Sequence, residues 1–138
     1  MTLHIEQDNV KMTSILIIDD SAWIAKTIKK VLESGGYQVV DIARDGLEGV
    51  DFYAKYRPDV VLLDITMPNM DGRECLENIM EFDRGARIIM VSAIKERTVV
   101  NECIARGARD FIQKPIDVRN EQRLAQLFET IDKAAAGA

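Results

Sequence analysis

The sequence predicts a doubly wound α/β fold, in which helices cover both faces of a parallel β-sheet. After residue 12, strand-like apolar segments alternate with segments of helical periodicity, and this alternation occurs five times. Alternating strands and helices are typical of a parallel sheet with crossover helices. The apolar segments are short and almost unbroken, as expected of strands that are buried on both faces.

The five expected strands comprise residues 14–19, 37–42, 59–64, 87–92 and 109–113. Polar side chains end or follow four of them: Asp19 and Asp20, Asp64, Ser92 and Lys114. The carboxyl ends of parallel strands meet at one edge of the sheet, where α/β proteins bind their ligands. We therefore expect these groups to converge. Carboxylates attract a metal ion, while a hydroxyl and an ammonium group can hold phosphoryl oxygens, so this edge indicates phosphoryl chemistry.

The first two helices have clear start signals. The first carries apolar residues at helical spacing after Ser21, a suitable N-cap, and a glycine pair ends it. Asp45 and Glu48 form a capping-box pattern at the start of the second helix, which runs to Tyr56 before a proline. These signals place both helices directly after strands.

The remaining three helices follow the same rules. The third begins near Asp71-Gly72, and the fourth carries its apolar residues just before Gly107. The fifth has the most regular apolar stripe, formed by Leu124, Leu127, Phe128 and Ile131. An alanine-rich end is expected to fray after it.

Composition limits the class of protein. A chain of 138 residues with 47% hydrophobic residues fits one domain. We expect this domain at residues 13–135, between a flexible leader at 1–12 and a frayed tail at 136–138. A net charge of -5 argues against direct binding of nucleic acid or an anionic membrane surface, since both favour basic patches.

The cysteines and the leader indicate a cytoplasmic location. Cys75 and Cys103 are the only cysteines, and each lies in an apolar helical pattern, which predicts buried free thiols. The leader has neither the apolar core of a signal peptide nor the length of a membrane span. The sequence thus predicts a soluble protein of a reducing compartment.

Asp19, Asp20 and Asp64 form the candidate metal and acceptor site. Two adjacent carboxylates at a strand end are costly without a cation, and Mg²⁺ takes hard oxygen ligands. The alternative is that Asp20 caps the next helix while Asp19 is solvated. Asp64 favours the metal site, because it closes another strand and can attack phosphorus to form an acyl phosphate. Its own alternative is an ordinary turn aspartate.

Ser92 and Lys114 are the candidate phosphoryl-oxygen partners. The Ser92 hydroxyl can bind such an oxygen, or it can simply satisfy the backbone. Lys114 is expected to pair with Asp64 or its phosphate, and Lys114-Pro115 is a candidate cis peptide bond that would aim the ammonium group. Phe111 fits the core, and its position three residues before Lys114 also suits a switching residue.

Taken in order along the chain, these features resemble the receiver domain of two-component response regulators, of the stand-alone chemotaxis (CheY-like) type. The similarity extends from about Ser14 to Ile131. It rests on Ile17-Ile18-Asp19-Asp20, Asp45-Gly46 with Glu48, Pro58 to Asp64, Met67-Pro68 with Met70-Asp71-Gly72, Ser92-Ala93, Gly107-Ala108 with Asp110-Phe111, and Lys114-Pro115. Each segment alone is weak, but all of them in order at domain-wide spacing are highly specific.

The resemblance implies a flavodoxin-like (βα)5 fold with strand order 2-1-3-4-5 and a phosphorylation switch. Asp64 would accept a phosphoryl group from a phosphohistidine of a sensor kinase or a phosphotransfer protein. Mg²⁺, or Mn²⁺ in its place, would be bound by Asp19, Asp20, Asp64 and the backbone carbonyl of Thr66. The protein would catalyse only its own phosphorylation and dephosphorylation.

The resemblance also implies how the signal leaves the domain. Ser92 would move toward the phosphoryl group, and Phe111 would turn inward behind it. The face formed by the fourth helix, the fifth strand and the fifth helix would change, and a downstream protein would dock there.

Thr66 and Ile94 should flank the path of the water that attacks the acyl phosphate. Ile94 cannot orient water, so we expect a long-lived phosphoryl group.

Two other classes of function compete with this interpretation. The first is an enzyme of the aspartyl-phosphate phosphatase type, but the chain has no length for a substrate cap, and its single histidine, His4, lies in the leader. The second is a binding module that keeps the fold and works without phosphorylation. The intact acidic, hydroxyl and lysine positions favour the phosphorylated switch over both.

Overall fold

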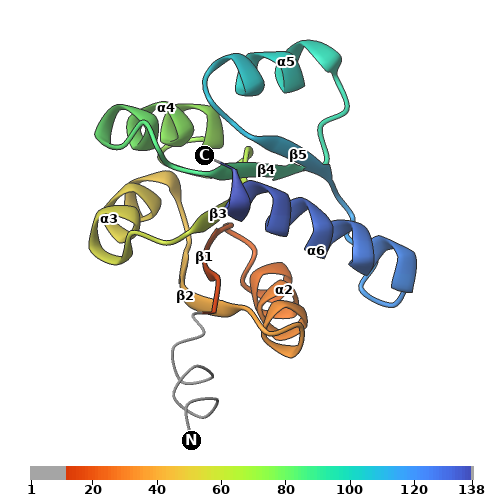
Figure 1. Cartoon of the computed structure of the whole chain (residues 1–138). Coiled ribbons are helices and arrows are strands. Elements are labelled where there is room, and N and C mark those ends of the chain that lie inside the picture. Colours follow the sequence, from red (N-terminus) through yellow and green to blue (C-terminus); the bar gives the residue numbers. More distant parts are fainter. Residues whose placement is uncertain (1–11, 138) are drawn as a thin grey trace, which may run out of the picture.

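The computed structural model describes residues 12–137, which form a five-stranded parallel sheet with helices on both faces (Figure 1). The strands are β1 (Ser14–Ile18), β2 (Gln38–Ala43), β3 (Val60–Asp64), β4 (Ile88–Ser92) and β5 (Asp110–Gln113). The helices are α2 (Ala22–Ser34), α3 (Gly46–Tyr56), α4 (Gly72–Phe82), α5 (Arg97–Ala105) and α6 (Glu121–Ala136). Each predicted strand agrees with the observed one to within one residue at either end.

The strand order is β2-β1-β3-β4-β5, which confirms the predicted doubly wound topology. In this order the chain reverses direction across the sheet between β1 and β3, and the carboxyl ends of these two central strands lie next to each other. Residues 1–11 and 138 lie outside the described part of the chain. Of the expected tail, Ala136 still belongs to α6.

Side chains of each strand alternate between two hydrophobic clusters, one on each face of the sheet. In β1, Ile15 and Ile17 join the cluster under α2 and α6, whereas Leu16 and Ile18 join the cluster under α3, α4 and α5. Figure 1 shows α2 and α6 together on one face of the sheet. The central strands are therefore apolar on both faces, and polar groups collect at their ends.

Helix caps at this edge follow from the polar residues between strands and helices. Ser21 accepts a hydrogen bond from the backbone N–H of Ile24, and Asp45 accepts one from that of Glu48 at 2.8 Å. Glu48 reaches back to the N–H of Arg44, one residue before the position in a regular capping box. Both predicted N-caps are confirmed.

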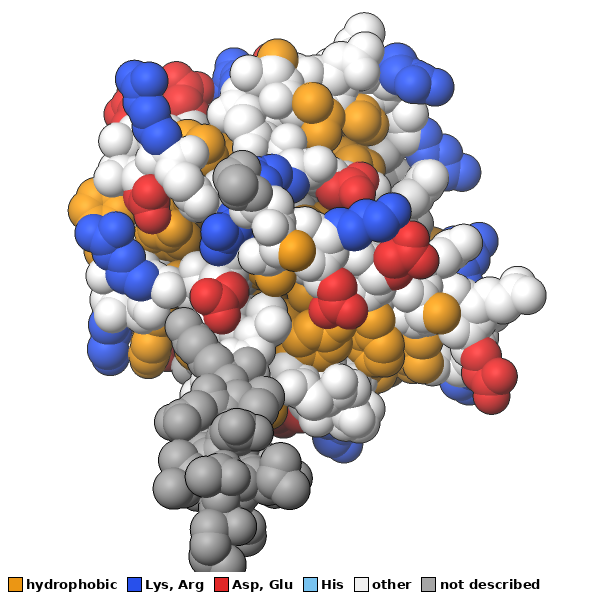
Figure 2. All heavy atoms as spheres, viewed as in Figure 1, with side chains coloured by type: hydrophobic (Ala, Val, Ile, Leu, Met, Phe, Trp, Pro, Cys, Tyr) orange, Lys and Arg blue, Asp and Glu red, His pale blue; other side chains and the backbone are white. Residues whose placement is uncertain are grey.

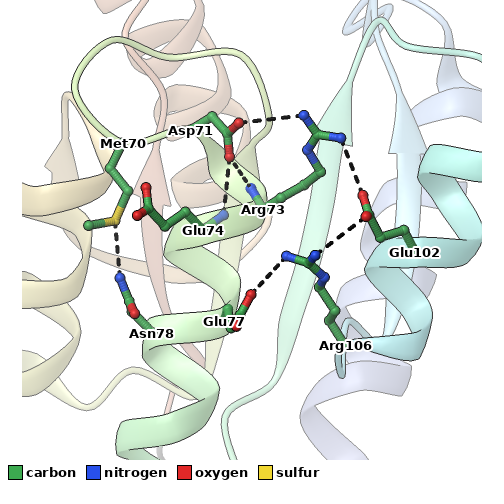
Figure 3. Close-up of polar contacts among 8 residues, drawn as sticks. All are labelled: Met70, Asp71, Arg73, Glu74, Glu77, Asn78, Glu102 and Arg106. Atoms are coloured by element: carbon green, nitrogen blue, oxygen red, sulfur yellow. Dashed lines mark hydrogen bonds and ion pairs between the residues drawn. The ribbon is translucent and has the colours of Figure 1, made fainter.

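A chain of ion pairs joins α4 to α5 (Figure 3). Arg73 contacts Asp71, the N-cap of α4, and Glu102 of α5 at 3.2 Å. Glu102 also contacts Arg106, which pairs with Glu77 of α4 at 2.8 Å. Within α5 only Cys103 is buried, and the N-cap position has no side-chain hydrogen bond. These ion pairs therefore add polar contacts between α4 and α5 to the packing of Cys103 and Val99 on the core.

We expect Glu102→Gln to lower the free energy of unfolding by about 0.5–1 kcal/mol, because it weakens contacts to two arginines at once. The loss should disappear in about 1 M NaCl, where exposed charges are screened. Urea unfolding at low and high salt measures both values. Glu129→Gln is the control, since Glu129 pairs with Lys133 inside one helix. Equal losses in both variants would contradict a special role of the α4–α5 ion pairs.

Candidate functional site

Three carboxylates meet where β1 and β3 end. Asp19 is 3% exposed and Asp64 is 7% exposed, whereas Asp20 is exposed to solvent. Each of the three offers a carboxylate oxygen, and these oxygens all lie within 4.8 Å of one another. Three hard anionic oxygens at this spacing fit a divalent cation such as Mg²⁺ or Mn²⁺. The structure thus brings together the carboxylates that the sequence selected.

Asp19 is buried, and each of its carboxylate oxygens accepts one hydrogen bond. One carboxylate oxygen accepts a hydrogen bond from the N–H of Ser21 at 2.9 Å, and the other accepts one from Lys114 Nζ at 2.8 Å. The alternative in which Asp19 is solvated and Asp20 caps α2 is therefore wrong. Ser21 provides the cap, and the pleat of β1 directs Asp19 inward.

Lys114 links the acidic site to the end of β5. Its ammonium group is 2.8 Å from Asp19 Oδ2 and 3.5 Å from Asp64 Oδ2, and its side chain is 15% exposed. The Lys114-Pro115 peptide bond is cis. The expected proximity to Asp64 is observed, whereas the closer contact with Asp19 was not predicted, because sequence order does not show which carboxylate of the pair faces inward.

The environment of Asp64 raises the pKa of its carboxyl group above the ordinary value. Burial raises the pKa of Asp64 to about 6, and the negative charges of Asp19 and Asp20 act in the same direction. Lys114 partly offsets this effect and lowers the pKa of Asp64. A cation between the carboxylates would relieve the repulsion among them, which is a physical reason for such a site to bind one.

The loop after Asp64 is closed by Gly72, the first residue of α4. Gly72 N–H donates to the carbonyl of Ile65 at 2.6 Å. A Cβ atom on Gly72 would lie against the carbonyl oxygen of Asp64 and 2.6 Å from Cα of Ile65. Thr66, the candidate carbonyl ligand, lies in this loop with an exposed side chain. Only glycine permits this crossing of the chain.

Ser92 and Ile94 lie on the neighbouring loop after β4. Ser92 is 2% exposed, and its hydroxyl accepts a hydrogen bond from the N–H of Ile94 at 3.2 Å. In this structure the Ser92 hydroxyl thus satisfies a backbone N–H group, which was the second of the two roles predicted for it. β4 pairs with β3 so that Val91 lies opposite Asp64, and Ser92 follows at the same edge. Ile94 is half-buried.

Phe111 lies in the middle of β5, beside Met90 of β4. It is half-buried and packs against the cluster under α3, α4 and α5. Phe111 is also one of the residues that line a pocket of about 190 Å³, together with Ile112 and Leu127. This packing agrees with the interpretation of Phe111 as a core residue, and its role as a moving residue stays a prediction.

Sequence reasoning missed a groove beside the acidic site. It has a volume of about 640 Å³ and is lined by Trp23 and Ile24 of α2 and by Lys114, Pro115 and Ile116. Trp23 is 77% exposed and lies outside the apolar stripe that predicted α2. Hydrophobic side chains also reach the surface between α2 and α6 (Figure 2). The sequence signal that could have indicated this groove was Trp23, a large apolar residue outside the buried apolar positions of α2.

This chain is similar to several known proteins. Residues 15–127 match the response regulator receiver domain family. The chemotaxis protein CheY of Treponema pallidum is 43% identical over 118 residues, which cover 83% of this chain and 82% of that protein. The CheY of Listeria monocytogenes is 40% identical over 124 residues, covering 90% of this chain and 99% of the relative.

Solved structures show the same fold. The CheX–CheY–BeF3–Mg²⁺ complex from Borrelia burgdorferi contains a chain that is 41% identical, with a TM-score of 0.78 and coverage of 89% of this chain and 93% of that one. The response regulator domain of Thermotoga maritima CheB has a TM-score of 0.83 at 35% identity, with coverage of 93% and 99%. Within residues 12–137, no helix has the length and hydrophobicity needed to cross a membrane.

Proposed function

Because this chain belongs to the response regulator receiver domain family, we propose that it is a phosphorylation switch with Asp64 as the acceptor. The observation that carries the proposal is the buried Asp64 carboxylate, held within 4.8 Å of oxygens of Asp19 and Asp20 and 3.5 Å from Lys114 Nζ. Residues 13–135 would form the receiver domain, acting in the cytoplasm.

The chemistry is a phosphoryl transfer to a carboxylate. An oxygen of Asp64 attacks phosphorus, a new O–P bond forms, and the bond between phosphorus and the donor's leaving group breaks. Bound Mg²⁺, held by Asp19, Asp20, Asp64 and the Thr66 carbonyl, would neutralise charge on the transferred group. Lys114 can move its hydrogen bond from Asp19 to a phosphoryl oxygen, and the Ser92 hydroxyl can exchange its contact with the N–H of Ile94 for one with the phosphoryl group.

A sensor histidine kinase or a phosphotransfer protein would supply the phosphoryl group, and a downstream protein would read the result. The downstream protein would dock on the face formed by α5, β5 and α6, and Ser92 and Phe111 would be the side chains that move. A new dianion at Asp64 contacts two arrangements of the β4–α5 loop differently, which is what a population shift requires. The CheY of Borrelia burgdorferi, which was crystallised with CheX, BeF3 and Mg²⁺, supports both a cation and a protein partner.

Intact mass after incubation with acetyl phosphate tests the proposal. We expect the wild-type protein to gain one phosphoryl group in the presence of Mg²⁺ and none after EDTA treatment. Asp64→Asn should gain none under either condition, because an amide cannot act as the nucleophile.

A wild-type protein that stays unmodified with acetyl phosphate is then tested with phosphorylated histidine kinases. Failure with these donors as well would overturn the proposal in favour of a phosphorylation-independent binding module. Phosphorylation of Asp64→Asn to the same extent as the wild type would show that the acceptor is a different residue.

Ile94 is expected to slow the hydrolysis of the acyl phosphate, because its apolar branched side chain cannot orient the attacking water. Ile94→Glu should therefore shorten the lifetime of the phosphorylated protein at least several-fold, since a carboxylate can act as a general base. The decay of the phosphorylated mass after removal of the donor measures this. Ile94→Val is the control, and an unchanged lifetime in Ile94→Glu would contradict the prediction.

A further inference from the structure

The loop between Asp64 and α4 contains an unusual backbone conformation at its tip. Asn69 has a φ angle of 68°, in the left-handed region that residues other than glycine rarely adopt. The N–H of Met70 donates to the carbonyl of Pro68 at 2.7 Å, across Asn69. A three-residue turn with positive φ at its centre is rare and strained, and such strain persists only where the surroundings hold it.

The side chain of Asn69 provides one of the contacts that hold this turn. Its amide Nδ2 donates to Asp45 Oδ2 at 2.8 Å. The other oxygen of Asp45 accepts the N–H of Glu48 and caps α3. The Glu48 N–H and, after it, the Asn69 amide lower the pKa of Asp45. The tip of the loop is thus tied to the first turn of α3, which follows a different strand.

A second contact supports the same arrangement independently. Gly46, the first residue of α3, lies so close to the loop that a Cβ atom there would be 2.5 Å from the carbonyl oxygen of Met70 and 2.7 Å from its Cβ. At its far end, the loop is closed by the hydrogen bond from Gly72 to Ile65. The segment that carries Thr66 is therefore held at both ends and at its tip.

We propose that Asn69 and Asp45 are positioning residues that shape this loop for the cation site, in which Thr66 would supply its carbonyl oxygen. The inference rests on the proposed function, because it assumes that the cation binds at Asp19, Asp20 and Asp64. Neither residue touches the cation in this scheme. They hold the loop in one conformation before the cation binds, so that less conformational entropy is lost on binding.

Two substitutions separate the hydrogen bond from the backbone geometry and from the helix cap. Asn69→Gly keeps a residue that accepts positive φ and removes the amide. Asp45→Ser keeps a good N-cap for α3 but is too short to reach Asn69. Asn78→Ala is the matched control, because it removes another asparagine amide that contacts this loop, at 3.5 Å from Met70 Sδ (Figure 3).

The first measurement is the affinity for Mn²⁺, followed through the electron paramagnetic resonance signal of the free ion, with Mg²⁺ as competitor. We expect Asn69→Gly and Asp45→Ser each to weaken binding about three- to tenfold, as the loss of one hydrogen bond to a charged group allows. The double variant should be no weaker than either single one, because both remove the same contact. Asn78→Ala should bind like the wild type.

The second measurement needs no metal. Amide hydrogen exchange at Met70 in metal-free protein should be faster in Asn69→Gly and Asp45→Ser than in the wild type, by a similar factor. Wild-type affinity for Mn²⁺ in both single variants would overturn the inference and leave the proposed function intact. No binding of Mn²⁺ by the wild-type protein would overturn both. Additive losses in the double variant would also contradict the inference.

Discussion

Replacing Gly72 with alanine is expected to destabilise the protein by about 2–3 kcal/mol and to prevent phosphorylation of Asp64. The added methyl group would overlap the carbonyl oxygen of Asp64 and approach Cα of Ile65 to 2.6 Å. Both are backbone atoms, so no side-chain rotation can relieve the overlap. The chain must shift at the residue that carries the nucleophile, which displaces its carboxylate from the other two.

This result is opposite in sign to what local helix propensity predicts. Gly72 is the first residue of α4, and alanine stabilises helices relative to glycine by about 1 kcal/mol. Gly85→Ala is the control, because a Cβ atom there would meet only Asp83 Oδ1 at 3.3 Å. Urea unfolding and acetyl phosphate labelling of both variants measure the effect. A Gly72→Ala protein as stable and as reactive as the wild type would contradict the argument.

Asp64→Asn is expected to be more stable than the wild-type protein at pH 7.5 in the absence of divalent cations, by about 3 kcal/mol. The pKa of Asp64 is about 6 in the folded protein and 3.8 for the unperturbed group. The folded state therefore binds the proton more tightly than the unfolded state does. A difference of about two pH units corresponds to about 3 kcal/mol.

The sign of this effect fixes its pH dependence. Below about pH 4 Asp64 is protonated in both states, and the contribution that lowers stability is absent. It develops as the pH rises from about 4 to 6 and is complete above that window. The stability difference between Asp64→Asn and wild type should grow over the same range. Saturating Mg²⁺ should reduce it, because a cation that binds the folded wild type stabilises it.

Asp83 provides a control of opposite sign. The hydroxyl of Tyr53 and the N–H of Gly85 lower the pKa of Asp83, so its carboxylate stabilises the folded state at neutral pH. Asp83→Asn should therefore be less stable than the wild type at pH 7.5, with a difference that shrinks as the pH falls through its folded pKa. Equal pH profiles for Asp64→Asn and the wild type would show that Asp64 is not held in a destabilised charged form.

The charge balance of the acidic site is sensitive to a bound cation and to modification of Asp64. Three carboxylates near one ammonium group leave an excess of negative charge at a mostly buried edge of the sheet. A cation or a covalent modification of Asp64 redistributes this charge and offers new partners to Lys114 and Ser92. Under the proposed function, the carboxylate that lowers the stability of the folded state would also be the group whose charge changes on phosphorylation.

Local sequence patterns predicted the order of the strands and helices, their ends and the polar residues at the carboxyl edge of the sheet. These features depend on local rules: apolar runs form buried strands, Ser21 and Asp45 cap helices, and parallel strands place their ends together. The resemblance to receiver domains then supplied the strand order. The candidate residues Asp19, Asp20, Asp64 and Lys114 could all be selected before any coordinate was known.

The contacts among these groups, in contrast, depend on how the whole chain folds. Lys114 and Asp19 are separated by 95 residues, and their contact at 2.8 Å depends on the pleat of β1 and the path of the chain after β5. Asn69 and Asp45 meet because the loops after β2 and β3 lie side by side, although β1 separates these two strands in the sheet. Helix and strand signals arise within a few residues, whereas such pairings depend on the packing of the whole sheet, which no local pattern contains.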